Sequence, residues 1–338
     1  DVSGLSGPTG PVPVPVSTDP SELGLPLPPA GERLGVAVYA PGSEEQLPSE
    51  IELLRPDEAT LWVQAALDPA EGEDAYLWVY LGAEPGAEAP PLSWGPEVRA
   101  VWHLGGDLED ASGNGHALTS PLAPPQGPRW MPGVAGLATR IVTGEYLERP
   151  ASPGLDPSGD VTVSGWFWLP AGHNAQHPTR MILEKFDNNS HSFQLALTGQ
   201  GFGGGGLLSQ VLLGRLLLKV ERGGFGTRYV YSGTGTWQPN RWYSFAAVIR
   251  GGDIDPPELY VDGELDVGGS VGSGTTGDLS FSTRWRLGGT TSDVVNGGSS
   301  TVYLDGALDE VRVFARALSA AEIALDHHLM TASVLIPV

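Results

Sequence analysis

The sequence predicts an all-β protein that consists of a small N-terminal β-sandwich and a larger C-terminal β-sandwich with one short helix near its end. Short runs of alternating side chains recur along the chain and are separated by turn residues, among which Gly (48) and Pro (30) exceed average usage. Apolar residues still make up 40% of the 338 residues, and ten tryptophans are available to fill cores. This combination indicates many short strands rather than disorder, and the length fits two domains.

The first sandwich is predicted over residues 21–97, after a Pro/Val-rich arm over residues 1–20. Its strands are expected at residues 34–39, 49–54, 60–66 and 75–81. In the run 60–66, Leu61 and Val63 alternate with Trp62 and Gln64, and a period of two with apolar residues on both faces indicates strands that are covered on both sides. Prolines crowded between residues 85 and 96 favour a short, stiff connector.

The second domain is predicted over residues 98–330, followed by an apolar tail over residues 331–338. Its helix is expected at residues 319–329, because Ser319 can cap it and Glu322 stands three residues on, as a capping box requires. The Gly-rich stretches 201–206 and 267–277 are expected to be hairpin loops. Strands are expected at residues 97–104, 138–143, 161–169, 180–185, 192–197, 215–221, 242–249, 258–261, 284–287 and 307–314.

Several segments of this second domain carry a resemblance, and they occur in the right order. They are Ala100-Val-Trp-His-Leu, Asp110-Ala-Ser-Gly-Asn-Gly-His, the strand 161–169, Asn240-Arg-Trp-Tyr-Ser-Phe, Glu258-Leu-Tyr-Val-Asp-Gly and residues 308–323. From Val101 onward the chain resembles the bacterial laminin-G-like, concanavalin A-type domains, which implies a jelly roll. The Pro-Val repeat, Leu47-Pro-Ser-Glu-Ile-Glu and Thr60-Leu-Trp-Val-Gln resemble a bacterial surface-protein domain of unknown function that precedes such a jelly roll.

Composition excludes several classes of function. The absence of Cys leaves only oxygen ligands or His for any metal and removes disulfides and thiol chemistry. A net charge of −22 argues against nucleic acid and anionic membrane surfaces as partners. No apolar run reaches the roughly 20 residues that span a bilayer. Together with the resemblance, we expect a bacterial protein that is secreted or held at the cell surface.

The sequence predicts that the protein is not an enzyme. Hydrolases on the resembled fold carry a Glu-x-Asp-x-x-Glu or Glu-x-Asp-x-Glu pattern, and no segment matches it, since the Glu264-Leu265-Asp266 run lacks a third member. Asp309 and Glu310 are adjacent, so on a regular strand they would point to opposite faces. No Gly-x-Ser-x-Gly segment precedes a helix, which argues against a serine hydrolase.

The loop from Asp110 to Asn114 is the best candidate for chemistry. The side-chain oxygens of Asp110, Ser112 and Asn114, at a spacing of two on a tight Gly turn, suit Ca²⁺ as a bound cofactor. The resemblance implies that a carboxylate near the sheet rim, Asp309 or Glu310, completes the shell. The alternative is an Asx-turn in which Asp110 only bonds its own backbone.

Two further kinds of site are considered. Trp130 and Trp237, which stand in expected loops, are the candidates for stacking on a sugar ring, while most tryptophans on alternating strand positions are expected in the core. The leading hypothesis is an extracellular adhesion or binding module for a glycan or a surface protein. The alternative is a structural subunit of a surface filament that self-associates through its terminal strands. The residues expected to mediate such assembly are Val12, Val14, Val16, Val334, Leu335 and Ile336.

Overall fold

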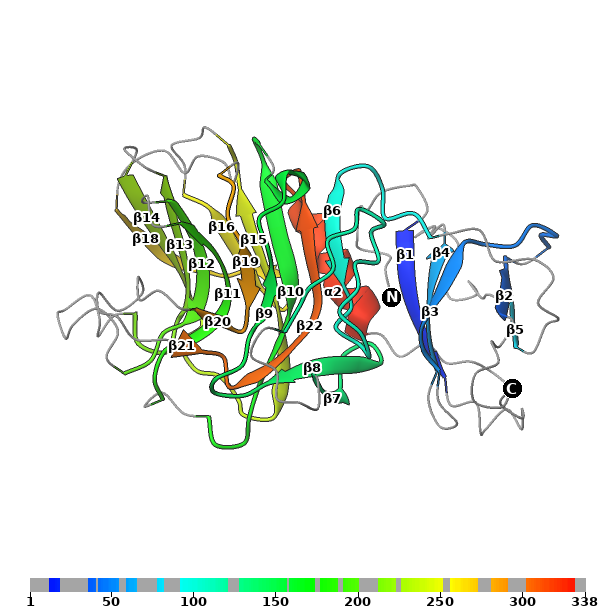
Figure 1. The fold of residues 1–338 in the computed structure, drawn as a ribbon, viewed down its shortest axis with the longest axis horizontal. Helices are drawn as coiled ribbons and strands as arrows, with labels where there is room; N and C mark the ends of the chain where they lie inside the picture. Colours follow the sequence, from blue (N-terminus) through cyan, green and yellow to red (C-terminus); the bar gives the residue numbers. More distant parts are fainter. Residues whose placement is uncertain are drawn as a thin grey trace.

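The computed structural model describes most of the chain and is almost entirely β-structure (Figure 1). The described residues are 12–18, 36–40, 42–54, 59–65, 78–81, 92–120, 128–156, 158–173, 177–187, 191–200, 212–222, 226–251, 256–272, 281–290 and 302–331. The predicted all-β class is confirmed.

The N-terminal part consists of two small sheets, one with strand order β1-β4-β3 and one that pairs β2 with β5. Val16, Leu61 and Val63 from the first sheet meet Val38 and Val79 from the second in one apolar cluster, which makes this part a small sandwich, as expected. The strands are β1 (Val12–Thr18), β2 (Val36–Tyr39), β3 (Ser49–Leu54), β4 (Ala59–Ala65) and β5 (Trp78–Leu81).

The Pro/Val segment is part of this sandwich and not a free arm. β1 pairs antiparallel with β4 of the same chain, and the side chains of Val14 and Val16 are buried there. The side chains of Val14 and Val16 are thus used by their own sandwich, while assembly through the edge of this strand at Val12, Val14 and Val16 stays a prediction. β1 lies at the sheet edge, where its prolines are tolerated. Val334, Leu335 and Ile336 lie outside the described residues.

The C-terminal part consists of two facing antiparallel sheets. The larger sheet runs β17-β16-β15-β10-β22-β8-β7, with β6 also paired to β22. Its strands are β6 (Val98–Trp102), β7 (Arg129–Pro132), β8 (Leu137–Ile141), β10 (Val161–Leu169), β15 (Arg241–Ile249), β16 (Glu258–Val261), β17 (Glu264–Leu265) and β22 (Gly306–Phe314).

The second sheet runs β18-β14-β13-β12-β11-β19-β9, and a separate hairpin pairs β20 with β21. These strands are β9 (Leu147–Arg149), β11 (Arg180–Asp187), β12 (His191–Leu197), β13 (Leu216–Arg222), β14 (Gly226–Ser232), β18 (Val267–Gly272), β19 (Trp285–Leu287), β20 (Gly289–Thr290) and β21 (Val302–Tyr303).

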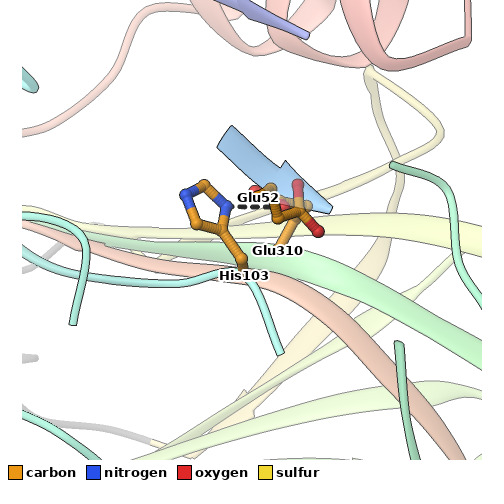
Figure 2. A group of neighbouring side chains, drawn as sticks. All are labelled: Glu52, His103 and Glu310. Carbon is orange, nitrogen blue, oxygen red and sulfur yellow. Dashed lines mark hydrogen bonds and ion pairs between the residues drawn. The ribbon is translucent and has the colours of Figure 1, made fainter. Parts of the chain in front are cut away.

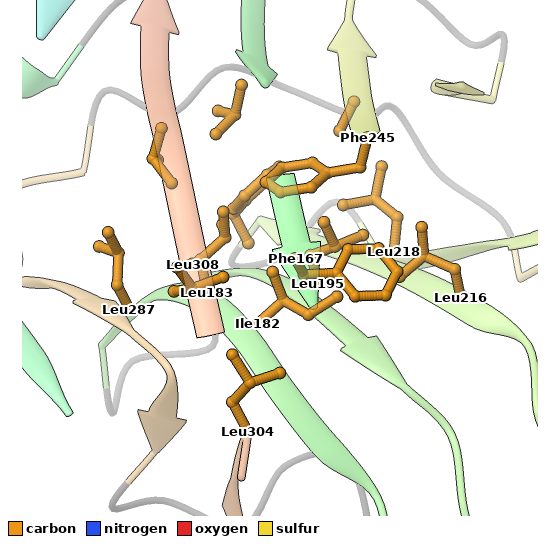
Figure 3. Close-up of a cluster of buried hydrophobic side chains, with 14 of the residues drawn as sticks. Phe167, Ile182, Leu183, Leu195, Leu216, Leu218, Phe245, Leu287, Leu304 and Leu308 are labelled. Atoms are coloured by element: carbon orange, nitrogen blue, oxygen red, sulfur yellow. The ribbon is translucent and has the colours of Figure 1, made fainter. Parts of the chain in front are cut away.

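The main core lies between these two sheets (Figure 3). The alternation in β10 places Phe167 inward, whereas Trp166 and Trp168 face the outer side of the eight-stranded sheet. The inward side chains come from both sheets and interdigitate. Among them are Phe167, Phe245 and Leu308 from one sheet and Ile182, Leu183, Leu195, Leu216, Leu218 and Leu287 from the other.

The helix α2 (Ala320–Thr331) lies between the eight-stranded sheet and the N-terminal sheet (Figure 1). The predicted capping box is confirmed, because the backbone N–H of Glu322 donates to Ser319 Oγ and the backbone N–H of Ser319 donates to Glu322 Oε2. Ile323 packs against Ala246, Val248 and Tyr260 on the outer face of the sheet. Within the described residues, no helix is both long and apolar enough to cross a bilayer.

Replacing Glu322 by Ala should lower the free energy of unfolding by about 1 kcal/mol at neutral pH, because the capping bonds are lost. Partial burial acts to raise the pKa of Glu322, but hydrogen bonds from Arg316 and Ser319 outweigh it, and the net pKa is lowered. A lowered folded pKa means that the contribution is present above the unfolded pKa and is lost as pH falls through the folded value. Urea denaturation of both proteins should give a smaller difference at about pH 3 than at pH 7. If the two proteins differ in free energy of unfolding by the same amount at both pH values, the cap does not depend on the charge of Glu322.

One loop prediction is wrong in part. Residues 267–272 of the expected loop 267–277 form β18, and β14 was not predicted at all. Their register joins Tyr229 to Val271 and Tyr231 to Gly269, so the glycines stand beside large aromatic side chains of the neighbouring strand. Gly269 lies against the Tyr231 ring, where a Cβ atom would be 2.4 Å from the phenolic oxygen. Residues 201–206 lie outside the described residues.

Candidate functional site

The Asp110 loop is bound to its own backbone. The Asp110 carboxylate accepts hydrogen bonds from the N–H groups of Val101 at 3.0 Å, Ser112 at 3.0 Å and His116 at 2.8 Å. The side chains of Ser112 and Asn114 donate to backbone carbonyls of β6 at 3.0 to 3.3 Å. These bonds are those of the Asx-turn alternative, and they hold the loop against β6.

Asp309 and Glu310, the other two predicted calcium ligands, lie in a different place. Asp309 Oδ2 accepts N–H bonds from Val134 at 2.6 Å and from Ala135 at 3.4 Å, while Glu310 Oε1 lies 2.7 Å from His103 Nδ1. The five predicted ligands are thus divided between two sites.

A β-bulge brings the two adjacent carboxylates into one charged cluster. The pairing of β22 with β10 slips by one residue between Asp309 and Arg312, and Glu310 has a φ of 50°. Both side chains are buried, and burial, followed by the charge of Glu310, raises the pKa of Asp309. On a regular strand, Asp309 and Glu310 would point to opposite faces, as expected from the sequence. The extra residue of the bulge interrupts this alternation, so the expectation does not apply here.

This charged cluster lies at the contact between the N-terminal sandwich and the larger domain (Figure 2). His103 Nε2 lies 2.8 Å from Glu50 Oε1, and the indole Nε1 of Trp62 donates to Glu52 Oε2 at 2.7 Å. Burial acts to lower the pKa of His103, but the charge of Glu310 and its hydrogen bonds outweigh this and raise it to about 10. Burial, and then the charge of Glu310, raise the pKa of Glu52 to about 9.

The two tryptophans predicted to stack on a ligand lie in different environments. Trp237 does lie outside the strands, but it is only 6% exposed, packs against Phe167 and Tyr243, and donates its indole N–H to Gly214 O at 2.6 Å. Its predicted stacking role is therefore wrong, because its ring is part of the core. Trp130 is half-buried in the edge strand β7, not in a loop.

Trp168 and Trp242 instead lie together on the outer face of the eight-stranded sheet. They stand directly opposite each other on β10 and β15, and both are half-buried. The preceding outward residue of β10, Trp166, is buried beneath α2, where His327 stacks on it at 5.1 Å. Trp168 and Trp242 are the next outward pair on these two strands, and Trp242 also packs against the cluster that contains Trp166 and Met330 of α2.

The same cross-strand row continues with two arginines. Trp168 is opposite Ala307 on β22, Ala307 is opposite Arg140 on β8, and Arg140 is opposite Arg129 on β7. Because Ala307 is small, the Arg140 guanidinium reaches over the Trp168 ring, 5.2 Å from its centroid. We call Trp242, Trp168, Ala307, Arg140 and Arg129 the tryptophan–arginine row.

Charged groups flank this row at its arginine end. Arg140 Nη2 lies 3.7 Å from Asp305 Oδ1, and Arg180 Nη1 lies 3.3 Å from Asp305 Oδ2. Burial lowers the pKa of Arg180, and the nearby charge of Arg140 adds to the effect, while Asp305 opposes it. At the other end, Arg241 is about half exposed.

A second polar row crosses the seven-stranded sheet, but it is closed off. Its residues stand opposite one another across five strand pairings, in the order Glu148, Arg286, Glu184, Gln194, Lys219 and Tyr229. Glu184, Gln194, Lys219 and Arg286 are all at most 7% exposed and bond within the row or to neighbours. Burial raises the pKa of Glu184. This row stabilises the sheet, and the accessible candidate site is the tryptophan–arginine row.

The two facing antiparallel sheets define a jelly roll of the concanavalin A class. Residues 143–324 match the family described as the concanavalin A-like lectin/glucanases superfamily, Laminin_G_3. The chain therefore belongs to this family, and the resemblance in the sequence is confirmed. A comparison with curated proteins gives no match.

Solved structures resemble the chain at low sequence identity. A mutant of HCR D/C VPI 5995 has a TM-score of 0.50 at 10% identity, over 69% of this chain and 52% of that chain. The binding domain of botulinum neurotoxin DC in complex with SialylT gives 0.49 at 10%, over 70% and 52%. Domain 4 of AbnA, an extracellular arabinanase of Geobacillus stearothermophilus, in complex with arabinotriose, gives 0.46 at 19%, over 68% and 98%. The chain thus spans about half the length of the first two.

Sequence reasoning missed the residues of the row. Trp168 and Trp242 stand on alternating strand positions, which are usually core positions, so neither was singled out. The available signal was their neighbours: Phe167 and Tyr243 stand beside them and take the inward face, which leaves the tryptophans outward.

Proposed function

We propose that the chain is a non-catalytic extracellular module that binds carbohydrate at the tryptophan–arginine row. The observation that carries the proposal is the pair Trp168 and Trp242, two half-buried indoles directly opposite each other, with Arg140 over one of them. The face of a pyranose ring presents C–H groups, and these are attracted to the negative face of an indole. Hydroxyl groups around the ring edge need donors and acceptors.

The charged residues beside the row provide those groups. Arg140, with 24% of its side chain exposed, and Asp305, with 40%, stand at one end, and a guanidinium offers five N–H donors in a fixed fork. Beyond the other end, Arg241, with 54% of its side chain exposed, is joined at 2.7 Å to Asp262, with 25%, and its guanidinium lies over the Tyr243 ring. A few polar groups around an apolar platform are typical of specific small-ligand sites. A secreted, cell-surface location and a role in adhesion are part of this proposal.

Replacing Trp168 by Ala should weaken binding to the best oligosaccharide at least about tenfold, or roughly 1.4 kcal/mol, because a central aromatic contact is lost. A glycan array with neutral and carboxylated oligosaccharides would identify the ligand, and isothermal titration calorimetry would measure the affinity. Arg140 to Ala should weaken it too, and most strongly for carboxylated glycans.

The matched control is Trp130 to Ala, since this tryptophan is also half-buried but stands opposite Thr139, which is next in register to the core residue Leu308. That variant should keep the affinity. If Trp168 to Ala binds as tightly as the unmodified chain, or if Trp130 to Ala loses as much, the assignment of the row as the glycan site is wrong.

A further inference from the structure

The residues Glu52, His103 and Glu310 come from three separate segments and meet at one point (Figure 2). One ligand atom from each lies within 4.8 Å of the others. Glu52 belongs to β3 of the N-terminal sandwich, His103 follows β6, and Glu310 belongs to β22 of the jelly roll.

Both carboxylates are aimed at this point by β-bulges. Glu310 is in the bulge of β22. In the pairing of β3 with β4, Ile51 is opposite Leu61 and Leu53 is opposite Thr60, so Glu52 is the extra residue. Bulges redirect a side chain at the cost of regular pairing, and they recur next to functional sites. Two bulges in two different sheets direct carboxylates to one imidazole, and this arrangement therefore indicates a functional site.

Each of the three side chains has one polar atom held by an outer partner. Glu52 Oε2 accepts from the Trp62 indole at 2.7 Å, His103 Nε2 lies 2.8 Å from Glu50 Oε1, and Glu310 Oε2 accepts from Arg312 at 2.9 Å. The remaining atoms are Glu52 Oε1, His103 Nδ1 and Glu310 Oε1, of which the last two are hydrogen-bonded to each other at 2.7 Å. Outer hydrogen bonds of this kind orient the ligands of metal sites, and a carboxylate behind a histidine is their commonest form.

The inner atoms are incompletely satisfied. Glu52 Oε1 is buried without a hydrogen-bond partner, and it lies against Gly105, where a Cβ atom would be only 2.2 Å away. Asp309, which is fully buried beside Glu310, also has an oxygen, Oδ1, without a partner. An unmade hydrogen bond at a buried oxygen destabilises the folded state unless a cation or proton neutralises it.

We propose that Glu52, His103 and Glu310 bind a divalent first-row transition metal ion, of which Zn²⁺ is the natural probe, and that this ion joins the N-terminal sandwich to the jelly roll. A mixed set of one imidazole and two carboxylates favours such an ion over Ca²⁺ or Mg²⁺, which take oxygen ligands. On binding, His103 Nδ1 and the Glu52 carboxyl group each release a proton to the solvent, and the two carboxylates then balance the charge of the ion.

The test uses the full chain without an affinity tag, treated with EDTA and desalted. Zn²⁺ titration by calorimetry and native mass spectrometry should give one tightly bound ion per chain, and thermal unfolding should shift upward with Zn²⁺ and return with EDTA. Glu52 to Gln keeps the acceptor for Trp62 and should weaken Zn²⁺ binding more than about 100-fold. Glu50 to Gln, which loses only the outer partner of His103, should weaken it roughly 10- to 100-fold.

The matched control is His177 to Gln, because the stacked rings of His173 and His177, 5.9 Å apart, are a second place where Zn²⁺ could bind. This variant should keep the tightly bound ion. The proposal is overturned if Zn²⁺ does not bind, if Glu52 to Gln binds it as tightly as the unmodified chain, or if only His177 to Gln abolishes it. Circular dichroism checks that each variant is folded, and Glu50 to Gln provides the decision if Glu52 to Gln is not. Glycan binding at the Trp168 surface is a separate readout.

Discussion

Replacing Arg312 by Ala should lower the free energy of unfolding by about 3–5 kcal/mol, the cost of removing one partner of a buried charge pair. Arg312 has only 6% of its side chain exposed, and its guanidinium lies 2.9 Å from Glu310 and 2.5 Å from Asp326. It also lies over two neighbouring indoles of the N-terminal part, 5.1 Å from the ring of Trp62 and 5.1 Å from that of Trp94. The variant leaves Glu310 buried without this cation and leaves a gap over the two rings.

The same variant should uncouple the two parts of the chain. Because Arg312 belongs to β22 and Trp62 to β4, the contact joins the jelly roll to the N-terminal sandwich. Urea unfolding followed by tryptophan fluorescence and by far-ultraviolet circular dichroism should coincide for the unmodified chain and separate for the variant. Arg284 to Ala is the control, since this arginine is 53% exposed and 3.6 Å from Glu148, and it should change stability by less than about 1 kcal/mol. A single coincident transition of unchanged midpoint in Arg312 to Ala would refute the coupling.

Replacing Lys185 by Met should also lower the free energy of unfolding by about 3–5 kcal/mol, although Met keeps nearly the same length. Lys185 is fully buried, with Nζ 2.5 Å from Asp156 Oδ1, 3.3 Å from Leu155 O and 4.7 Å from the centre of the Phe281 ring. Removing the ammonium leaves the Asp156 carboxylate, which is only 9% exposed, without its cation.

A double variant distinguishes lost charge pairing from lost packing. If the cost comes from the uncompensated carboxylate, the change of Asp156 to Asn in the Lys185 to Met background should recover more than half of the lost stability. Chemical denaturation of the four proteins gives the coupling energy. If the free energy of unfolding of Lys185 to Met is within about 1 kcal/mol of that of the unmodified chain, the Lys185–Asp156 pair is not a main contributor to the stability of this domain.

The strands were the most predictable part of the molecule. The period-two pattern predicted 49–54, 161–169 and 258–261 to the residue. The pattern failed at β18, where glycines leave no side-chain periodicity to detect. The helix was predictable because its cap is local: Ser319 and Glu322 are only three residues apart.

The sites were less predictable because they depend on long-range contacts. Glu310 and His103 are 207 residues apart in sequence and 2.7 Å apart in space. A bulge inserts one residue without a sequence signal, so Glu52 and the change of face at Glu310 could not be predicted from alternation. Both lysines of the chain, Lys185 and Lys219, are buried in ion pairs, which the sequence pattern did not indicate.

The edge position of β1 has a consequence for the behaviour of the protein in concentrated solution. An open sheet edge normally offers a ladder of N–H donors on which a second molecule can build, and this is a common start of aggregation. Pro13 and Pro15 have no N–H, and among the described strands β1 pairs only with β4, so its other side is depleted of donors. The Pro-Val repeat thereby protects the small sandwich against non-specific sheet growth.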